Sequence, residues 1–408
     1  MRPALALAAA LLVAVLPTPT SSLANGAPAR SSGQRRTYFA CRHTYESTLR
    51  KELERVGATR TSSPCPGLVA ASDAEGLDPA YALQTLPDAH AVSGESAKDL
   101  ATAALAALPL KLLAGAPRGS LVTHCLVPDT LKGRPAARAQ WHARATRVGE
   151  MVTATLKKSH PCARRASVDF EGDPVLLQLL LLDAENLVVS LAPSRRVPAV
   201  GGRWPGVEYP GGFADASDTN PDVESDKAMA GSAYRKLLEA LACAGESPQA
   251  GDTAVDLGAA PGSWTQALLR LGCESVTAVD RSSLAPQVLK DRGVDFVQGD
   301  AFTFPPRKVD WLVSDVIAFP DRVVEIIDSW SGMAKRMVLT MKFTGDEPDW
   351  EALLRAKQAA QKRGYALRAK HFFANKNEVT LMLAPAEAEA GEAGGDSDQV
   401  WRQMGPVR

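Results

Sequence analysis

The chain has 408 residues, of which 45% are hydrophobic and 23% charged, so it has a globular rather than a disordered or fibrous composition. Its 46 basic and 46 acidic residues balance, and net charge therefore gives no indication of a polyanionic partner. The six cysteines form no C-x-x-C pair and the histidines do not cluster, which excludes a zinc site or a disulfide framework as the basis of the fold.

The first 36 residues have the composition of a targeting peptide. One arginine precedes an apolar run that is too short to span a bilayer, and small residues at 21–24 offer a cleavage site. Residues 25–36 are basic, rich in serine and free of acid. We therefore expect a signal-plus-transit leader over residues 1–36, leading to a plastid or, second, a mitochondrion, with no membrane association after processing. A cytoplasmic protein is the alternative.

Short strands and helices alternate over residues 37–190, which predicts one or two α+β modules. The predicted strands cover residues 37–41, 67–70, 121–127, 175–182 and 187–190. Thr44 is placed to cap a helix that carries Leu49, Leu53 and Val56 on one face and ends at Gly57. A second helix is expected over residues 95–113, interrupted at Pro109.

Nine basic residues and a single acid, Glu150, lie between Lys132 and Arg165, with Trp141 and His142 among them. On a helix, Val148, Met151, Val152 and Thr155 would face inward and most of the cations outward. A basic face with aromatics favours RNA, and a solvated helix face is the alternative. The predicted RNA-binding residues are Arg144, Arg147, Lys157, Lys158, Arg164 and Arg165.

Residues 191–226 are rich in Pro, Gly, Asp and Ser, and are expected to form a linker. A second domain is predicted over residues 227–384, and residues 385–408 form a Glu/Ala/Gly-rich tail that we expect to be disordered. Strands alternate with helices in this domain, which predicts an α/β fold with a doubly wound, mostly parallel sheet. Its predicted strands cover residues 253–255, 275–279, 296–297, 311–314, 336–341 and 378–383.

The stretch D-L-G-A-A-P-G-S-W at residues 256–264 lies between a predicted strand and a predicted helix. Glycines in such a turn let a ligand approach the main chain closely, but the third glycine of a dinucleotide fingerprint is missing, which disfavours a nicotinamide dehydrogenase. An acid followed by G-x-x-P-G instead favours S-adenosylmethionine, with Asp256 near its positively charged methionine portion. The predicted cofactor-binding residues of this turn are Asp256, Gly258, Ala259, Ala260, Pro261, Gly262, Ser263 and Trp264.

Ionisable residues end or follow four other predicted strands, and the carboxyl ends of parallel strands line the ligand crevice. Asp280 lies 24 residues beyond Asp256, where a carboxylate accepts hydrogen bonds from a ribose. Asp300 is placed to contact the adenine amino group. Asp315 follows the next strand and borders the same crevice, and Lys342 follows the strand after that.

These motifs, together with Ser314-Asp315, Met341-Lys342 and Asn377-Glu378-Val379, resemble the FtsJ-type 2′-O-ribose RNA methyltransferases. The resemblance implies a Rossmann-like fold, S-adenosylmethionine as cofactor and a Lys-Asp-Lys-Glu tetrad. The tetrad would consist of Lys236, Asp315, Lys342 and Glu378. The family pattern around its first lysine matches only in part here, which leaves Lys227 and Arg235 as alternatives to Lys236.

A second resemblance covers residues 37–190 through Phe39-Ala40-Cys41-Arg42, Val127-Pro128-Asp129 and the basic helix. These stretches are similar to the RlmM type of that family, which methylates a cytidine ribose in 23S ribosomal RNA and carries a THUMP region. The resemblance implies a THUMP-like, ferredoxin-like RNA-binding region here and ribosomal RNA as partner. Another structured RNA or a silent RNA-binding scaffold is the alternative, while a small-molecule methyltransferase would leave residues 37–190 without a role.

A ribose 2′-OH is a weak nucleophile, so methyl transfer needs a base and an aligned electrophile. Lys342 is the expected base, because burial and a second cation such as Lys236 both lower the pKa of a lysine. Asp315 and Glu378 would then orient the two amines. This chemistry requires no metal.

Overall fold

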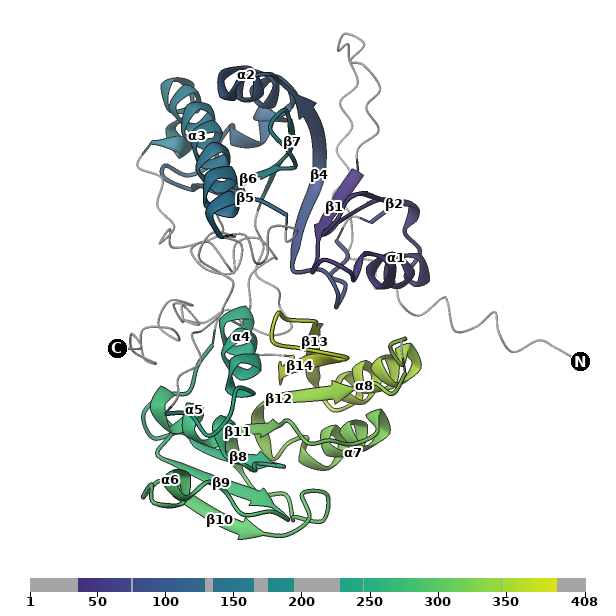
Figure 1. Cartoon of the computed structure of the whole chain (residues 1–408), viewed down its shortest axis with the longest axis vertical. Coiled ribbons are helices and arrows are strands. Elements are labelled where there is room, and N and C mark those ends of the chain that lie inside the picture. The colour runs from purple at the N-terminus through teal and green to yellow at the C-terminus, as the bar shows by residue number, and fades with distance from the viewer. Residues whose placement is uncertain are drawn as a thin grey trace, which may run out of the picture.

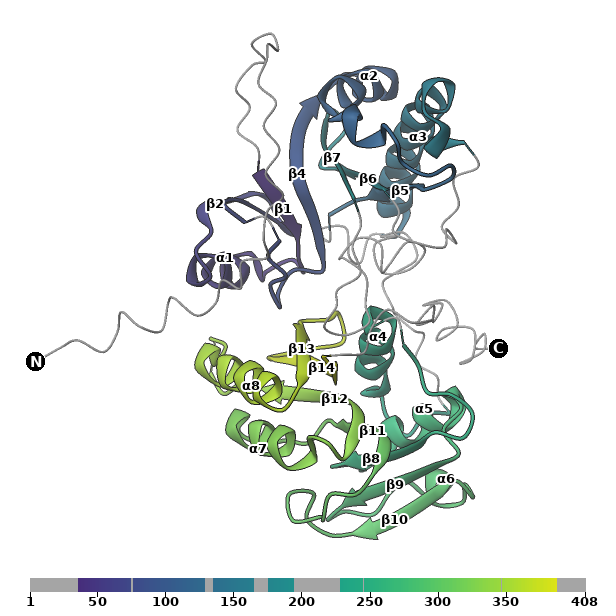
Figure 2. The same cartoon turned by 180° about the vertical axis from the view of Figure 1, so that it is seen from behind.

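The computed structural model describes residues 36–74, 76–128, 135–164, 175–193, 228–244, 246–345 and 347–386, without the side chains of residues 135–139. The described residues form two bodies, each built on a seven-stranded sheet (Figures 1 and 2). The predicted leader lies outside the described residues except for Arg36, which begins the first strand. Lys227, Arg165, the predicted tail beyond residue 386 and the predicted linker beyond residue 193 also lie outside them.

The N-terminal region (residues 36–193) contains a sheet with the strand order β2-β3-β1-β4-β7-β6-β5. All neighbours are antiparallel except β5 and β6. The long strand β4 belongs to both halves, so the two expected modules share one sheet (Figure 1). The strands are β1 (Arg36–Ala40), β2 (Thr59–Cys65), β3 (Leu68–Ser72), β4 (Gln84–Ser93), β5 (Leu121–Leu126), β6 (Val175–Leu181) and β7 (Asn186–Pro193).

Helices α1 (Glu46–Arg55), α2 (Ala97–Ala107) and α3 (Pro135–Ser159) cover this sheet, with short 3-10 turns η1 (Leu110–Leu113) and η3 (Pro161–Ala163). The predicted cap of α1 is wrong: Tyr45 occupies the cap position without a side-chain bond, and Thr44 has a left-handed φ of 79°. Ser96 caps α2 instead, in a reciprocal pair with Asp99. No helix among the described residues is both long and apolar enough for a membrane span.

The C-terminal domain (residues 228–386) has the predicted α/β fold, with the strand order β10-β9-β8-β11-β12-β14-β13. Its first five strands run parallel, while β14 is antiparallel to both neighbours. The strands are β8 (Thr253–Leu257), β9 (Ser275–Asp280), β10 (Val294–Gln298), β11 (Val309–Ser314), β12 (Ala334–Lys342), β13 (Tyr365–Lys370) and β14 (Glu378–Pro385). The helices are α4 (Tyr234–Ala244), α5 (Ser263–Leu271), α6 (Pro286–Leu289), α7 (Pro320–Trp330) and α8 (Trp350–Lys362).

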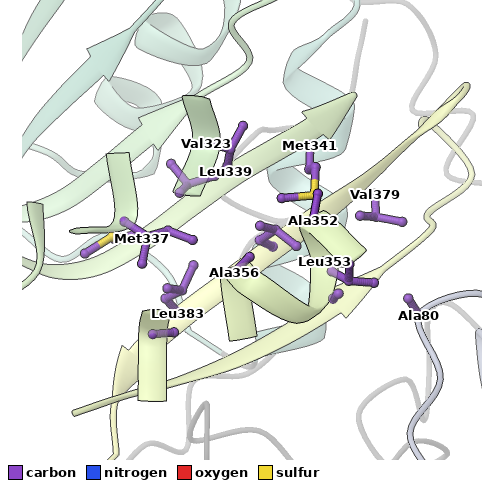
Figure 3. Close-up of a cluster of buried hydrophobic side chains, with 14 of the residues drawn as sticks. Ala80, Val323, Met337, Leu339, Met341, Ala352, Leu353, Ala356, Val379 and Leu383 are labelled. Carbon is purple, nitrogen blue, oxygen red and sulfur yellow. The ribbon is translucent and has the colours of Figure 1, made fainter. Parts of the chain in front are cut away.

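Alternate residues of the central strands point to opposite faces of this sheet, and helices cover both faces. Ala254 and Val313 pack with α4 and α5, whereas Val255 and Leu339 pack with α7 and α8. The hydrophobic cluster beneath α7 and α8 extends into the N-terminal region. Ala80 belongs to this cluster and lies at its edge, near Leu353 and Val379 (Figure 3). The two bodies therefore share a hydrophobic core along the β13–β14 side of the C-terminal domain.

Candidate active site

Four elements of the C-terminal domain bring Lys236, Asp315, Lys342 and Glu378 together at the carboxyl edge of the sheet. Lys236 lies in the first turn of α4, Asp315 follows β11, and the last residue of β12, Lys342, is directly paired with Glu378 of β14. The Nζ of Lys236 lies 2.9 Å from both carboxylate oxygens of Asp315 and 2.8 Å from Oε1 of Glu378. Lys236 is thus held between two acids.

Lys342 shares one of these acids. Its Nζ lies 3.0 Å from Oδ1 of Asp315 and donates a hydrogen bond of 2.6 Å to the main-chain oxygen of the same residue. Thr340, two residues earlier on β12, also donates to Oδ1 at 2.7 Å. Asp315 therefore holds both lysines next to each other, with its own carboxylate fixed by a hydroxyl group.

The surroundings of the two lysines differ. Burial alone would lower the pKa of Lys236, but the charges of Asp315 and Glu378 outweigh it and raise that pKa above its ordinary value. Lys236 therefore stays protonated. The side chain of Lys342 is 21% exposed against 11% for Lys236, so Lys342 is the more accessible amine for a substrate.

The predicted cofactor turn lies between β8 and α5. Gly258 and Gly262 have left-handed φ angles of 77° and 109°, and a Cβ would meet Val316 and Val288 side-chain atoms at 2.8 and 2.9 Å. Only glycine fits both positions. The Ala260–Pro261 peptide between them is cis. From the helix, the indole of Trp264 donates to the carbonyl of Ala233 at 2.7 Å, which ties the turn to the start of α4.

Asp256 lies beneath this turn rather than on its surface. Its side chain accepts a hydrogen bond of 2.6 Å from the Thr265 hydroxyl, and only 1% of the residue is exposed. Burial raises the pKa of this carboxyl to about 7, assisted by the nearby charges of Asp315 and Asp280 and opposed by the bond from Thr265. Contact between Asp256 and the methionine portion of the cofactor stays a prediction.

Asp280 is the last residue of β9, and Asp300 follows the neighbouring parallel strand β10. Both therefore lie at the same edge of the sheet as the turn between β8 and α5. Asp280 accepts main-chain hydrogen bonds from Ala260 at 3.0 Å and Ser282 at 2.7 Å. Asp300 accepts from Phe302 and from the guanidinium of Arg281, which lower its pKa. Both carboxylates remain partly exposed and can accept hydrogen bonds from the ribose and the adenine amino group.

Comparison with known proteins matches residues 231–341 to the FtsJ-like methyltransferase family model. This range contains Lys236, the Gly258–Gly262 turn and Asp315. The chain carries an FtsJ-like methyltransferase domain. S-adenosylmethionine is the cofactor of this domain, and the residues present fit it: the two glycines bring the main chain close, and Asp280 supplies a ribose acceptor.

Two curated relatives are both named ribosomal RNA large subunit methyltransferase M. The protein from Aromatoleum aromaticum is 38% identical over 145 residues, which cover 34% of this chain and 39% of the relative. The one from Halorhodospira halophila is 36% identical over 158 residues, covering 36% and 43%. The chain thus spans about two fifths of the length of these relatives.

Among solved structures, magnesium protoporphyrin IX methyltransferase from Synechocystis with bound SAM has a TM-score of 0.27 and 15% identity, covering 33% of this chain and 71% of that one.

The segment that leads into Glu378 is held by the N-terminal region. Arg42 donates hydrogen bonds of 3.0 and 2.6 Å to the carbonyls of Phe372 and Asn375, at the start and middle of the β13–β14 connection. His371, whose pKa burial and Arg42 lower to about 3, packs as a neutral ring against both Tyr45 and Tyr81. This clamp connects the N-terminal region to the FtsJ-like domain, and its contact with Asn375 lies three residues before Glu378.

The predicted RNA-binding residues on α3 have different surroundings. Arg144 donates to the carbonyl of Ala184 at 2.6 Å and fastens the β6–β7 turn, and Arg147 pairs with Glu150. Lys157 and Lys158 are exposed at the end of α3, where Arg164 folds back onto the carbonyl of Lys157. Val148 and Val152 face inward as predicted and Met151 is half-buried, but Thr155 is exposed and Leu156 takes the inward position instead.

Sequence reasoning missed Thr340 and Arg42. Thr340 could have been found, because it lies two residues before Lys342 on one strand and so on the same face. No local sequence pattern pointed to Arg42, since its hydrogen-bond partners lie some 330 residues away.

A surface hollow of about 350 Å³ lies elsewhere, at the amino ends of β8, β11 and β12, and is not the candidate site. No group of metal-ligating residues occurs within the described ranges.

Proposed function

We propose that this protein transfers a methyl group from S-adenosylmethionine to a ribose 2′-OH of large-subunit ribosomal RNA. The observation that carries the proposal is the Lys236-Asp315-Lys342-Glu378 cluster beside the cofactor turn. The cofactor supplies a methyl group on a positively charged sulfur. A small acid-base cluster next to such a methyl group suits a hydroxyl acceptor, which must lose a proton during transfer.

In this proposal Lys342 accepts the proton of the 2′-OH through its Nζ. Lys236 stays positively charged between Asp315 and Glu378, which raise its pKa, and so is the less suitable base of the two lysines. Asp315 positions both amines, and the hydrogen bond from Thr340 fixes its carboxylate. The partial burial of the cluster limits competition from water for the hydrogen bonds of the reacting groups.

The choice of ribosomal RNA is supported by the names of the relatives and by the exposed cations of α3. The leader-like composition of residues 1–36 supports a plastid, with a mitochondrion as the second organelle. Another structured RNA and a catalytically silent scaffold of the same fold are the alternatives.

The direct test is transfer of tritiated methyl groups from S-adenosylmethionine to organellar large-subunit ribosomal RNA. A 2′-O-methyl group removes the nucleophile of alkaline RNA cleavage, so the modified position must become resistant to alkali. The matched control is the same RNA with a 2′-deoxy nucleotide at that position, which should accept no label. Label on a base, or label in the deoxy control, would contradict ribose methylation. No transfer to any RNA would favour the silent scaffold.

A further inference from the structure

We propose that Ile317 and Phe319 form a stacking platform for an unpaired nucleobase beside the nucleotide that is methylated. The inference rests on the proposed function and extends it, because it makes an unstacked RNA strand the substrate class. The site lies in the connection between β11 and α7, immediately after Asp315.

The exposure of these two side chains is unusual for their type. Ile317 is 89% and Phe319 71% exposed, more than any other large hydrophobic residue in the described part of the chain. Both lie in a five-residue connection whose other apolar members, Val316 and Ala318, are half-buried. Two large apolar groups that face solvent side by side in one short connection indicate a binding surface rather than a packing accident.

The connection is positioned firmly next to the reactive groups. Ile317 lies two residues after Asp315, so their Cα atoms are at most about 7 Å apart. The main-chain oxygen of Asp315 binds the Nζ of Lys342. At the other end, Phe319 is the residue that precedes the first turn of α7, and the buried Pro320 holds it in an extended conformation. In this proposal, a ribose whose 2′-OH contacts Lys342 places its own or a neighbouring base over this connection.

Two arginines accompany the aromatic groups near the platform, each paired with an acid. Arg322, in the first turn of α7, lies over the ring of Phe302 at 4.2 Å and pairs with Glu325, and the exposed Arg281 pairs with Asp300. Apolar and aromatic surfaces interleaved with cations are how proteins hold single-stranded nucleic acid, because each base offers a face for stacking and each phosphate a charge.

The test compares Phe319→Ala, Phe319→Leu and Phe319→Trp in the full chain. Stacking of one base is worth about 5- to 150-fold in affinity by alanine substitution, so Phe319→Ala should weaken RNA binding within that range. Phe319→Leu keeps an apolar side chain but has no ring, and should bind nearly as weakly, whereas Phe319→Trp should bind like the native protein. Met333→Ala, an exposed hydrophobic residue at the opposite edge of the sheet, is the matched control and should change nothing.

A second measurement changes the RNA. RNA with an abasic nucleotide on either side of the methylated position should bind the native protein more weakly than intact RNA. Phe319→Ala should not distinguish the two RNAs, because the contact is already lost. Full affinity of Phe319→Ala in a protein that still methylates RNA would overturn the platform and leave the proposed function standing. Absence of methyl transfer by the native protein would instead overturn the proposed function.

Discussion

At the scale of single residues, the two lysines of the tetrad have the same functional group and opposite roles. Lys236 is enclosed by two carboxylates that stabilise its charge, whereas Lys342 shares one carboxylate and is more exposed. A base must be able to reach its substrate and to exist without its proton. The greater exposure of Lys342 and the raised pKa of Lys236 both favour Lys342 as the proposed base.

Replacing Lys342 by arginine should therefore abolish most of the activity while keeping the charge. Arginine stays protonated at physiological pH, so it cannot accept the 2′-OH proton. Single-turnover methyl transfer should fall by about 100-fold or more, the range for losing a general base. Lys335→Arg, at the far end of the same strand, is the control and should transfer normally. Near-normal transfer by Lys342→Arg would remove the base role from this residue.

The buried carboxyl of Asp256 predicts a pH dependence. Its pKa is raised to about 7 in the folded protein, so the stability it contributes is complete below its unfolded pKa of about 4. That stability is lost as the pH rises through 7, because ionising a buried carboxyl without a cation is unfavourable. Asp256→Asn should consequently raise the melting temperature at pH 8 and have little effect at pH 4, measured by thermal unfolding without cofactor.

The same carboxyl should respond to the charge of the cofactor. If Asp256 lies near the positive sulfur, S-adenosylmethionine should bind more tightly as the pH rises through 7. The demethylated product, whose sulfur is neutral, should show no such increase. Calorimetric titrations of both ligands between pH 6 and 8 compare them directly, and equal pH profiles would place the sulfur away from Asp256.

At the scale of elements, the connection between β13 and β14 joins the N-terminal region to the residues of the tetrad. Arg42 holds two carbonyls of this connection, and Glu378 follows it directly. Glu378 in turn positions Lys236. The N-terminal region is thereby part of the support of the tetrad in addition to any contact it makes with RNA.

Arg42→Ala should slow methyl transfer without weakening cofactor binding. Displacement of a catalytic group by about 1 Å can cost on the order of 100-fold, so we expect a loss of about 10- to 100-fold in the single-turnover rate. Arg55→Ala is the matched control, because Arg55 also pairs across this interface, but with Glu351 of α8 and not with the connection. An unchanged rate in Arg42→Ala, with the protein folded, would show that the clamp does not support Glu378.

At the scale of the whole molecule, α3 lies on the other body from the FtsJ-like domain (Figures 1 and 2), and its Lys157 and Lys158 are exposed. Reversing the charges of Lys157 and Lys158 should weaken RNA binding and flatten its salt dependence, because each lost phosphate contact reduces the logarithmic slope by about 0.7 to 0.9. Lys362→Glu on α8 is the control for overall charge. Filter binding at several salt concentrations measures the slope. An unchanged slope would make α3 a solvated face.

Much of the fold follows from local pattern. The strands of the FtsJ-like domain were predictable because each is a short apolar run followed by an ionisable residue or a turn. Strand β13 was not predictable, because Arg368 and Lys370 make its sequence polar. In the folded protein, Asp78 of the N-terminal region forms ion pairs with both of these buried cations. Strand β2 is an exposed edge, and β4 contains Pro87, so neither carries the usual strand signal.

The sequence by itself determined which residues can do the chemistry, because the glycines of the cofactor turn and the residues at strand ends are local features. Only the tertiary structure decided their roles. The sheet order places β8 next to β11 and β12 next to β14, which brings residues 236, 315, 342 and 378 within hydrogen-bonding distance. Lys236 keeps its proton because two carboxylates surround it, and those neighbours come from distant parts of the chain that no local pattern contains.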